Sequence, residues 1–245
     1  MKVGIIGAGA IAKFLLERLN KEQSDVGVVT ALYVRNKEKY KLLAEQYGVE
    51  LYTEIEEFVK ADIDIVVEAA ELEAVKELVP KVVRYKSVVI ISIGALTEGE
   101  LLEKLQQLST SYKQKVYLPS GAIGGLDLLQ NAQALGGVTN VLLTTTKPAG
   151  SLSEKNVNQP YIIFEGNAQE AIKKFPKNMN VSIVLALAGL GFENTMVKLI
   201  ADPKAKQNVH EITIQGEFGE ATITVKNNPL PTNPKTSYLA AMSIL

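Results

Sequence analysis

The chain has 245 residues, and its 26 basic and 27 acidic side chains give a formal net charge of −1. This balance argues against nucleic acid as a partner, because neutralising a phosphate backbone requires an excess of positive charge. Hydrophobic residues make up 47% of the chain, which is typical of a globular protein. Cysteine is absent, and this excludes disulfides and thiolate metal ligands.

The sequence predicts neither a membrane segment nor a secretion signal. No uncharged apolar run approaches about 18 residues, the minimum for a membrane-spanning helix. The chain begins with an apolar strand pattern and not with a charged segment, an apolar core and a cleavage site. We therefore expect a cytoplasmic protein that binds neither membranes nor nucleic acid.

The first 118 residues alternate between short β-branched apolar runs and longer helical segments. Strands are predicted at 3–6, 26–34, 63–67, 88–92 and 116–118, with helices at 10–20, 37–47, 71–84 and 97–109 between them. Continuously apolar strands separated by helices are typical of a parallel sheet that is covered on both faces. The pattern predicts an α/β domain at 1–118 with a Rossmann-type, doubly wound parallel sheet.

The pattern changes after Pro119. Strands are predicted at 138–146, 161–165, 196–201, 210–215 and 221–225, with an apolar helix at 181–190. Strands grouped without a helix between each pair indicate a second, α+β domain at 119–232 with a mostly antiparallel sheet. The tail at 233–245 has a helical pattern with proline near its start.

The sequence Gly7-Ala8-Gly9-Ala10-Ile11-Ala12 has the spacing G-x-G-x-x-A between the first strand and the first helix. Gly7 suits a tight turn, Gly9 lets a pyrophosphate approach the backbone, and Ala12 allows close packing of helix against sheet. The helix N-terminus offers N–H groups to the phosphates, so Gly7, Gly9, Ala10 and Ile11 are candidate dinucleotide-binding residues. A glycine turn without a ligand is the alternative.

The end of the second strand is where an acidic residue would bind the ribose hydroxyls of a dinucleotide. The sequence has Val34 and Arg35 there and no carboxylate. Two interpretations of Arg35 stay open: it pairs with the 2′-phosphate of NADP, or it is a solvated residue at a strand end. The predicted cofactor is therefore NAD or NADP. The loops at 68–70 and 92–95, after the next two strands, are expected to face its nicotinamide half.

His210 is the only histidine of the chain, and it shares strand parity with Ile212 and Ile214. It would therefore point toward the packed face of its strand, near the edge. An imidazole with an ordinary pKa near 6.5 is suited to moving a proton near neutrality, so His210 is a candidate catalytic base. A hydrogen-bonded histidine without a catalytic role is the alternative. Because one histidine and no cysteine leave only carboxylates as ligands, we expect no metal site.

Polar donors in the second domain are candidates for binding a carboxylate. All three arginines, Arg18, Arg35 and Arg84, lie in the first domain. A carboxylate site in the second domain would therefore use lysine, hydroxyl, amide or backbone donors without an arginine fork. Asn208 shares the parity of His210, and Lys147 follows three threonines, but each also suits an ordinary structural role.

Seven segments together resemble the L-aspartate dehydrogenase family over essentially the whole chain. They are the glycine turn and the segments at 118–125, 145–148, 180–181, 201–203, 208–212 and 233–237. The sequences LPSGAIGG at 118–125, NVHEI at 208–212 and NPKTS at 233–237 are typical of that family and not of Rossmann proteins in general.

The resemblance implies an NAD(P)-dependent oxidation of L-aspartate to iminoaspartate, which enters pyridine nucleotide biosynthesis or hydrolyses to oxaloacetate and ammonia. It implies that His210 is catalytic and that Ala122 and Asn180 contact the cofactor. It places Asn208, Thr236 and Ser237 near the substrate carboxylates. It also implies that the C-terminal helix folds back toward the dinucleotide-binding domain.

Two positions depart from the family pattern: Val34 replaces the expected ribose-binding aspartate, and Gln207 replaces an expected arginine. They leave open a two-domain reductase of another amino acid or imine, and a nucleotide-binding sensor without turnover. The apolar strands of the second domain predict a homodimer or a higher homo-oligomer.

Overall fold

The computed structural model describes residues 1–245 apart from 23, 98, 153–157 and 177–178. The chain divides into two compact units, Met1–Pro119 with Ile244–Leu245, and Ser120–Ser243. Among the described residues, no helix has the length and apolar character needed to span a membrane.

The first unit contains a six-stranded parallel sheet in the order β3-β2-β1-β4-β5-β6. Its strands are β1 (Lys2–Ile6), β2 (Val28–Tyr33), β3 (Glu50–Tyr52), β4 (Ile65–Glu68), β5 (Ser87–Ile90) and β6 (Val116–Tyr117). The chain builds the sheet outward from β1 in one direction and then from β4 in the other. The predicted doubly wound parallel sheet is therefore confirmed, with its switch point between β1 and β4.

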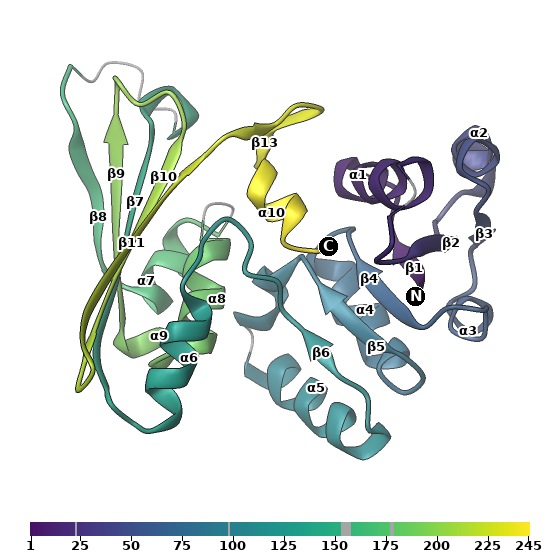
Figure 1. The fold of residues 1–245 in the computed structure, drawn as a ribbon, viewed down its shortest axis with the longest axis horizontal. Helices are drawn as coiled ribbons and strands as arrows, with labels where there is room; N and C mark the ends of the chain where they lie inside the picture. Colours follow the sequence, from purple (N-terminus) through teal and green to yellow (C-terminus); the bar gives the residue numbers. More distant parts are fainter. Residues whose placement is uncertain (23, 98, 153–157, 177–178) are drawn as a thin grey trace. The chain divides into compact units, whose positions relative to one another are not determined.

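Helices connect these strands (Figure 1). They are α1 (Ala10–Leu16), continued by a π-helical turn (Glu17–Lys21), α2 (Lys37–Tyr47), α3 (Ile55–Phe58), α4 (Leu72–Val82), a 3-10 turn (Ile93–Thr97) and α5 (Gly99–Tyr112). The bounds of α2 are those predicted, because Asn36 caps its start by accepting from the Lys39 N–H at 3.1 Å, and Gly48 ends it with φ of 65°. Ile244 packs against the core of this unit.

The second unit contains a five-stranded sheet in the order β11-β10-β7-β9-β8. Its strands are β7 (Val138–Pro148), β8 (Tyr161–Asn167), β9 (Thr195–Asp202), β10 (Asn208–Gly216) and β11 (Gly219–Asn227). Only the β7–β9 pair is parallel, so the predicted mostly antiparallel sheet is confirmed. The β10–β11 hairpin sets a register that pairs His210 with Val225 and Asn208 with Asn227.

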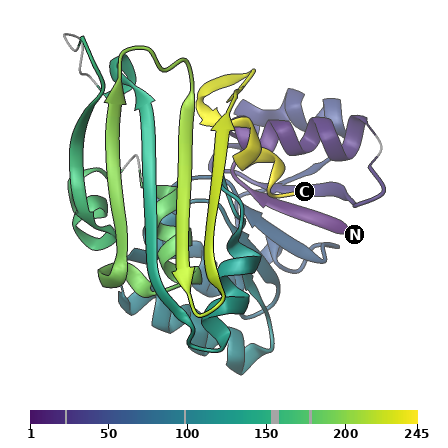
Figure 2. The same ribbon diagram turned by 60° about the vertical axis from the view of Figure 1, so that its left-hand side comes forward.

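Helices cover one face of this sheet (Figure 1), and Figure 2 shows its other face uncovered. The helices are α6 (Leu126–Ala134), a 3-10 turn (Ala149–Leu152), α7 (Ala168–Lys174), α8 (Asn180–Ala188) and α9 (Gly191–Asn194). Burial alternates accordingly along β7, where Val141, Leu143 and Thr145 are buried and Leu142 and Thr144 are only half-buried.

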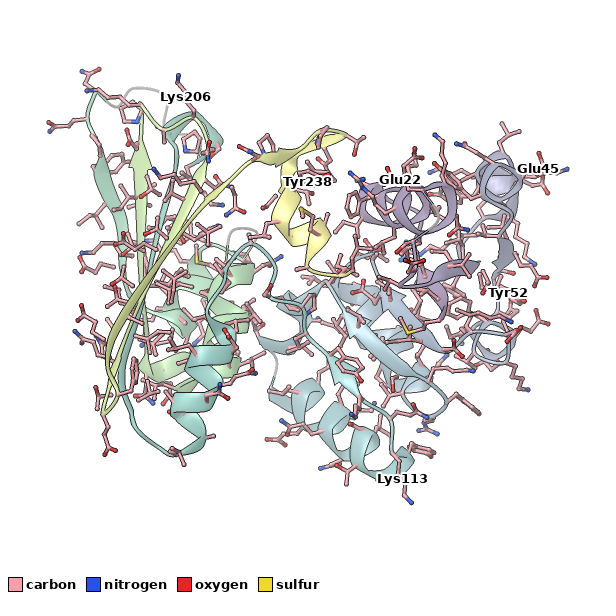
Figure 3. All side chains as sticks on the ribbon, viewed as in Figure 1. Glu22, Glu45, Tyr52, Lys113, Lys206 and Tyr238 are labelled. Carbon is pink, nitrogen blue, oxygen red and sulfur yellow. The ribbon has the colours of Figure 1, made fainter. Side chains whose placement is uncertain are left out.

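The predicted helix at 233–245 is wrong over its first five residues. Asn233–Ser237 forms strand β13, which pairs antiparallel with β12 (Pro229–Leu230), and the helix α10 is confined to Tyr238–Met242. The N–H of Tyr238, labelled in Figure 3, donates to the Asn228 carbonyl at 2.9 Å. Pairing with a neighbouring strand satisfies the backbone that a helix would otherwise have satisfied, and helical periodicity carries no information about such a partner.

Candidate functional site

The turn after β1 has the geometry of a phosphate cradle. Gly7 has φ of 103°, and a Cβ there would lie 2.8 Å from the Ala69 carbonyl oxygen, so only glycine fits without strain. Gly9 precedes α1 with an ordinary φ of −78°, and the nearest atom to a Cβ there is 3.9 Å away. Open space beside Gly9 is what the close approach of a pyrophosphate requires.

The start of α1 supplies donors to the same place. Its first intrahelical backbone bond runs from the Lys13 N–H to the Gly9 carbonyl at 3.0 Å, so the preceding N–H groups have no acceptor within the helix. Those N–H groups include Ala10 and Ile11, and the helix dipole adds positive potential beside them. The structure therefore brings Gly7, Gly9, Ala10 and Ile11 together, and they fit the diphosphate of a dinucleotide.

Arg35 follows β2 and is exposed, whereas the side chain of Val34 is buried in the core. The Arg35 guanidinium forms an ion pair with Glu71, which precedes α4. A carboxylate from another loop, 36 residues away in the sequence, thus lies beside Arg35. Sequence reasoning missed Glu71 because no local pattern connects it with Arg35.

The two loops expected to face the nicotinamide are joined by one buried carboxylate. Glu68, at the end of β4, is fully buried and accepts from the Ala70 N–H at 2.8 Å, the Ser92 N–H at 3.0 Å and the Ser92 hydroxyl at 2.9 Å. Burial raises the pKa of Glu68, and the donors from Ser92 and Ala70 oppose that rise. Glu68 therefore fixes the loop after β4 to the loop after β5.

His210 lies in the second unit on β10, with 4% of its surface exposed. Its Nδ1 is 3.0 Å from the Thr145 hydroxyl on β7, the residue paired with it across the sheet. Burial, followed by the positive charge of Lys147, lowers the pKa of His210 to about 4. The imidazole is therefore neutral at pH 7, and it is a weaker base than the imidazole of ordinary pKa that the sequence predicts. Thr145 engages Nδ1, and the meeting of Nε2 with a substrate stays a prediction.

A buried asparagine links three predicted site segments. Asn227, paired with Asn208 across β10 and β11, donates from Nδ2 to the Ala122 carbonyl at 2.9 Å. Its Oδ1 accepts from the Ser237 hydroxyl at 2.7 Å. The Asn227 side chain thus joins Ala122 to Ser237, and Asn208 is its partner across the two strands. Sequence reasoning missed Asn227, although counting back along the β10–β11 hairpin would have placed it opposite Asn208.

Two other predicted site residues of this unit lie on different elements. The Thr236 hydroxyl, on β13, accepts from the Asn233 amide at 3.0 Å. Asn180 is exposed and begins α8. The roles of Thr236 and Asn180 stay predictions.

Two protein families match this chain, one over each of its two parts. Residues 7–119 match the family described as homoserine dehydrogenase, NAD binding domain, and residues 127–245 match that described as aspartate dehydrogenase, C-terminal. With the glycine turn on a parallel sheet, these matches define a two-domain NAD(P)-dependent oxidoreductase.

Individual relatives define the family. The L-aspartate dehydrogenase of Methanocaldococcus jannaschii is 40% identical over 99% of this chain and 94% of its own length. That of Methanospirillum hungatei is 41% identical over 100% and 94%. The crystal structure of aspartate dehydrogenase from Thermotoga maritima matches with a TM-score of 0.80 and 31% identity, over 100% of this chain and 93% of that one. The chain belongs to the L-aspartate dehydrogenase family.

Substitutions at the two glycines of the turn should separate folding from dinucleotide binding. Gly7→Ala should lower the free energy of unfolding by about 1–3 kcal/mol, because alanine is strained at a positive φ. Gly9→Ala should leave it unchanged and weaken NADH binding at least about tenfold, because its Cβ fills the space for the phosphates. Urea unfolding and NADH fluorescence titration measure these quantities. Unaltered NADH affinity in Gly9→Ala would rule out this cradle.

Burial of a neutral imidazole should make stability depend on pH. The ordinary pKa of 6.5 applies to unfolded His210, and the folded value is about 4. Between these values the unfolded chain binds more protons, so stability falls as the pH drops from 6.5 toward 4. From pH 7 to pH 5, the wild type should lose about 2 kcal/mol more of its free energy of unfolding than His210→Gln. Urea unfolding at both pH values measures this difference, and equal losses would contradict the low pKa.

Proposed function

We propose that this protein oxidises L-aspartate to iminoaspartate with NAD or NADP, the first domain binding the dinucleotide and the second binding the substrate. The observation that carries the proposal is the buried, neutral His210, oriented by Thr145 in a chain of this family. The iminoaspartate hydrolyses to oxaloacetate and ammonia or is used in pyridine nucleotide biosynthesis.

His210 supplies the acid–base chemistry in this proposal. The substrate amine must lose its proton before an imine forms, and the neutral imidazole accepts that proton at Nε2. The bound nicotinamide supplies the acceptor for the hydride that leaves Cα. Thr145 holds the ring in one orientation through Nδ1, which keeps Nε2 in place for the substrate.

Amide, hydroxyl and backbone groups bind the two substrate carboxylates. Asn208 and Ser237 lie beside Asn227, which fixes Ser237 by a hydrogen bond of 2.7 Å. Thr236 precedes Ser237 on β13, and the backbone at 121–125 adds N–H donors other than that of Gly121, which already has an acceptor. The Ser243 hydroxyl accepts from the Gly121 N–H at 3.2 Å, which ties this loop to the end of α10.

The dinucleotide is held by residues of both domains. The cradle of Gly7, Gly9, Ala10 and Ile11 binds its diphosphate, and Ala122 and Asn180 contact its other parts. Arg35 and Glu71 together decide the ribose specificity. The carboxylate of Glu71 accepts from the ribose hydroxyls of NAD, whereas Arg35 pairs with the 2′-phosphate of NADP only in competition with Glu71.

Absorbance of the reduced cofactor with L-aspartate tests the proposed reaction, with NAD and NADP measured side by side. We expect turnover by the wild type and roughly a 10²-fold or greater loss in His210→Gln, the usual effect of removing a general base. Glu211→Gln is the matched control, because Glu211 is the next residue of the same strand and is exposed. Arg35→Leu should lower the rate with NADP relative to that with NAD.

Other outcomes of this assay would indicate a different function. NADH binding with turnover of another amino acid, but not of L-aspartate, would indicate a reductase with another substrate. NADH binding without turnover of any amino or keto acid would indicate a nucleotide sensor. Wild-type turnover in His210→Gln would remove His210 from the mechanism.

We propose further that the protein is a cytoplasmic homodimer or higher homo-oligomer, joined through the uncovered face of the second sheet. Leu142 and Met196 pair across β7 and β9 on this face, and Met196 is 39% exposed. Met196→Lys should reduce the native mass to that of a monomer in sedimentation analysis. Leu135→Lys, at a 90% exposed position, is the control. A wild-type monomer would contradict the proposed assembly. Cell fractionation tests the proposed cytoplasmic location.

A further inference from the structure

Lys147 shares a face of the second sheet with His210. On β7 it lies two residues after Thr145, so both side chains point to the same face. On β10, Asn208 and His210 are related in the same way. Because His210 pairs with Thr145, the same register places Asn208 beside Lys147. The two strands lie side by side in Figure 2. The four polar residues belong to the end of β7 and the start of β10.

The charge of Lys147 reaches the imidazole. Lys147 is half-buried, and burial lowers its pKa. Its positive charge is the second cause, after burial, of the low pKa of His210. On its other side His210 faces β11, where Val225 and Asn227 carry no charge. Among the described residues of the two flanking strands, Lys147 is thus the charged group that acts on His210.

A dicarboxylate bound at this strand end needs a positive charge. Taking two carboxylates out of water without a cation is costly, and His210 is neutral at pH 7. The arginines of the chain all belong to the first 119 residues. Five other lysines of the second unit, Lys173, Lys174, Lys204, Lys206 and Lys226, are exposed, and Lys198 lies 2.9 Å from Glu165.

We propose that Lys147 binds a carboxylate of the substrate and that this contact makes His210 a stronger base only when the site is loaded. The proposal rests on the proposed function and adds the residue that selects a dicarboxylic acid. Before binding, the ammonium opposes protonation of the imidazole. One carboxylate cancels that charge, and the second reverses the local field, so a proton on Nε2 becomes favourable. A monocarboxylic amino acid lacks the second charge and leaves His210 a weaker base.

The imidazole signal of His210 tests this proposal directly, because the chain contains no other histidine. NMR titration of the folded protein should be run alone, with succinate and with propionate. Succinate carries two carboxylates and no amine, so it binds without reacting. We expect succinate to raise the pKa of His210 by about one unit or more, the scale of a nearby opposite charge, and propionate to raise it less.

Lys147→Met removes the charge and keeps an unbranched side chain. In this variant the pKa of His210 should rise without ligand, and succinate should no longer shift it. KM for L-aspartate should increase roughly 10- to 150-fold, as expected for loss of a hydrogen bond between charged groups, with a smaller change in kcat. Lys206→Met is the matched control, because Lys206 is exposed in the turn between β9 and β10 (Figure 3).

The outcomes separate this inference from the proposed function. Oxidation of L-aspartate together with an unchanged His210 titration in Lys147→Met would overturn the role of Lys147 alone. A succinate response that depends on Lys147, in a protein that does not oxidise L-aspartate, would support the dicarboxylate site and overturn the proposed reaction. If Lys147→Met does not fold, Lys147→Gln replaces it. The wild type alone also tests the proposal: a His210 pKa that succinate does not change would overturn it.

Discussion

Burial of the chain's only imidazole is the constraint on which the proposed substrate site depends. A desolvated ring disfavours the protonated form, and the same low dielectric strengthens the effect of every neighbouring charge. Both consequences follow from the register of the second sheet, which places His210 opposite Thr145 on the helix-covered face. A slip of one residue would move the ring to the other face of the sheet, away from Thr145 and the buried side chains beside it. The hairpin between β10 and β11, which sets this register, is therefore as important to the chemistry as the ring itself.

The first domain buries an ionisable group in a different way. Glu68 is more deeply buried than His210, but three N–H groups and one hydroxyl donate to its carboxylate. Such a set of partners opposes the effect of burial on the carboxylate and makes its position rigid, which suits a residue that joins the two loops proposed to face the cofactor. His210 has one hydroxyl partner at Nδ1, and in the proposed function its Nε2 meets the substrate. On that proposal, the number of partners distinguishes a buried group that positions others from one that exchanges a proton.

The sequence predicted those parts of the structure that depend on local or strictly periodic interactions. The helix at 37–47 has a capping asparagine and a terminal glycine, and the parallel strands are continuous apolar runs. The short elements β3 and α3 were not predicted, because three or four residues are too few to show a period. Strand parity predicted the burial of His210, but the contacts of Asn227 and Glu71 depend on register and on distant segments meeting. Helical periodicity at 233–237 was overridden by pairing with β12.

The pair of Arg35 and Glu71 shows why a missing motif residue does not settle specificity. A ribose hydroxyl responds to where a carboxylate lies and not to which strand carries it. Val34 is buried and contributes nothing to that surface, but Glu71 brings a carboxylate to Arg35 from the start of α4. The ion pair gives this edge of the sheet both signs of charge. On the proposed function, NAD would use this carboxylate as it stands, whereas a 2′-phosphate would have to displace or share the arginine's partner, and like-charge repulsion opposes sharing. The valine at the end of β2 alone would not have indicated this competition between the two cofactors.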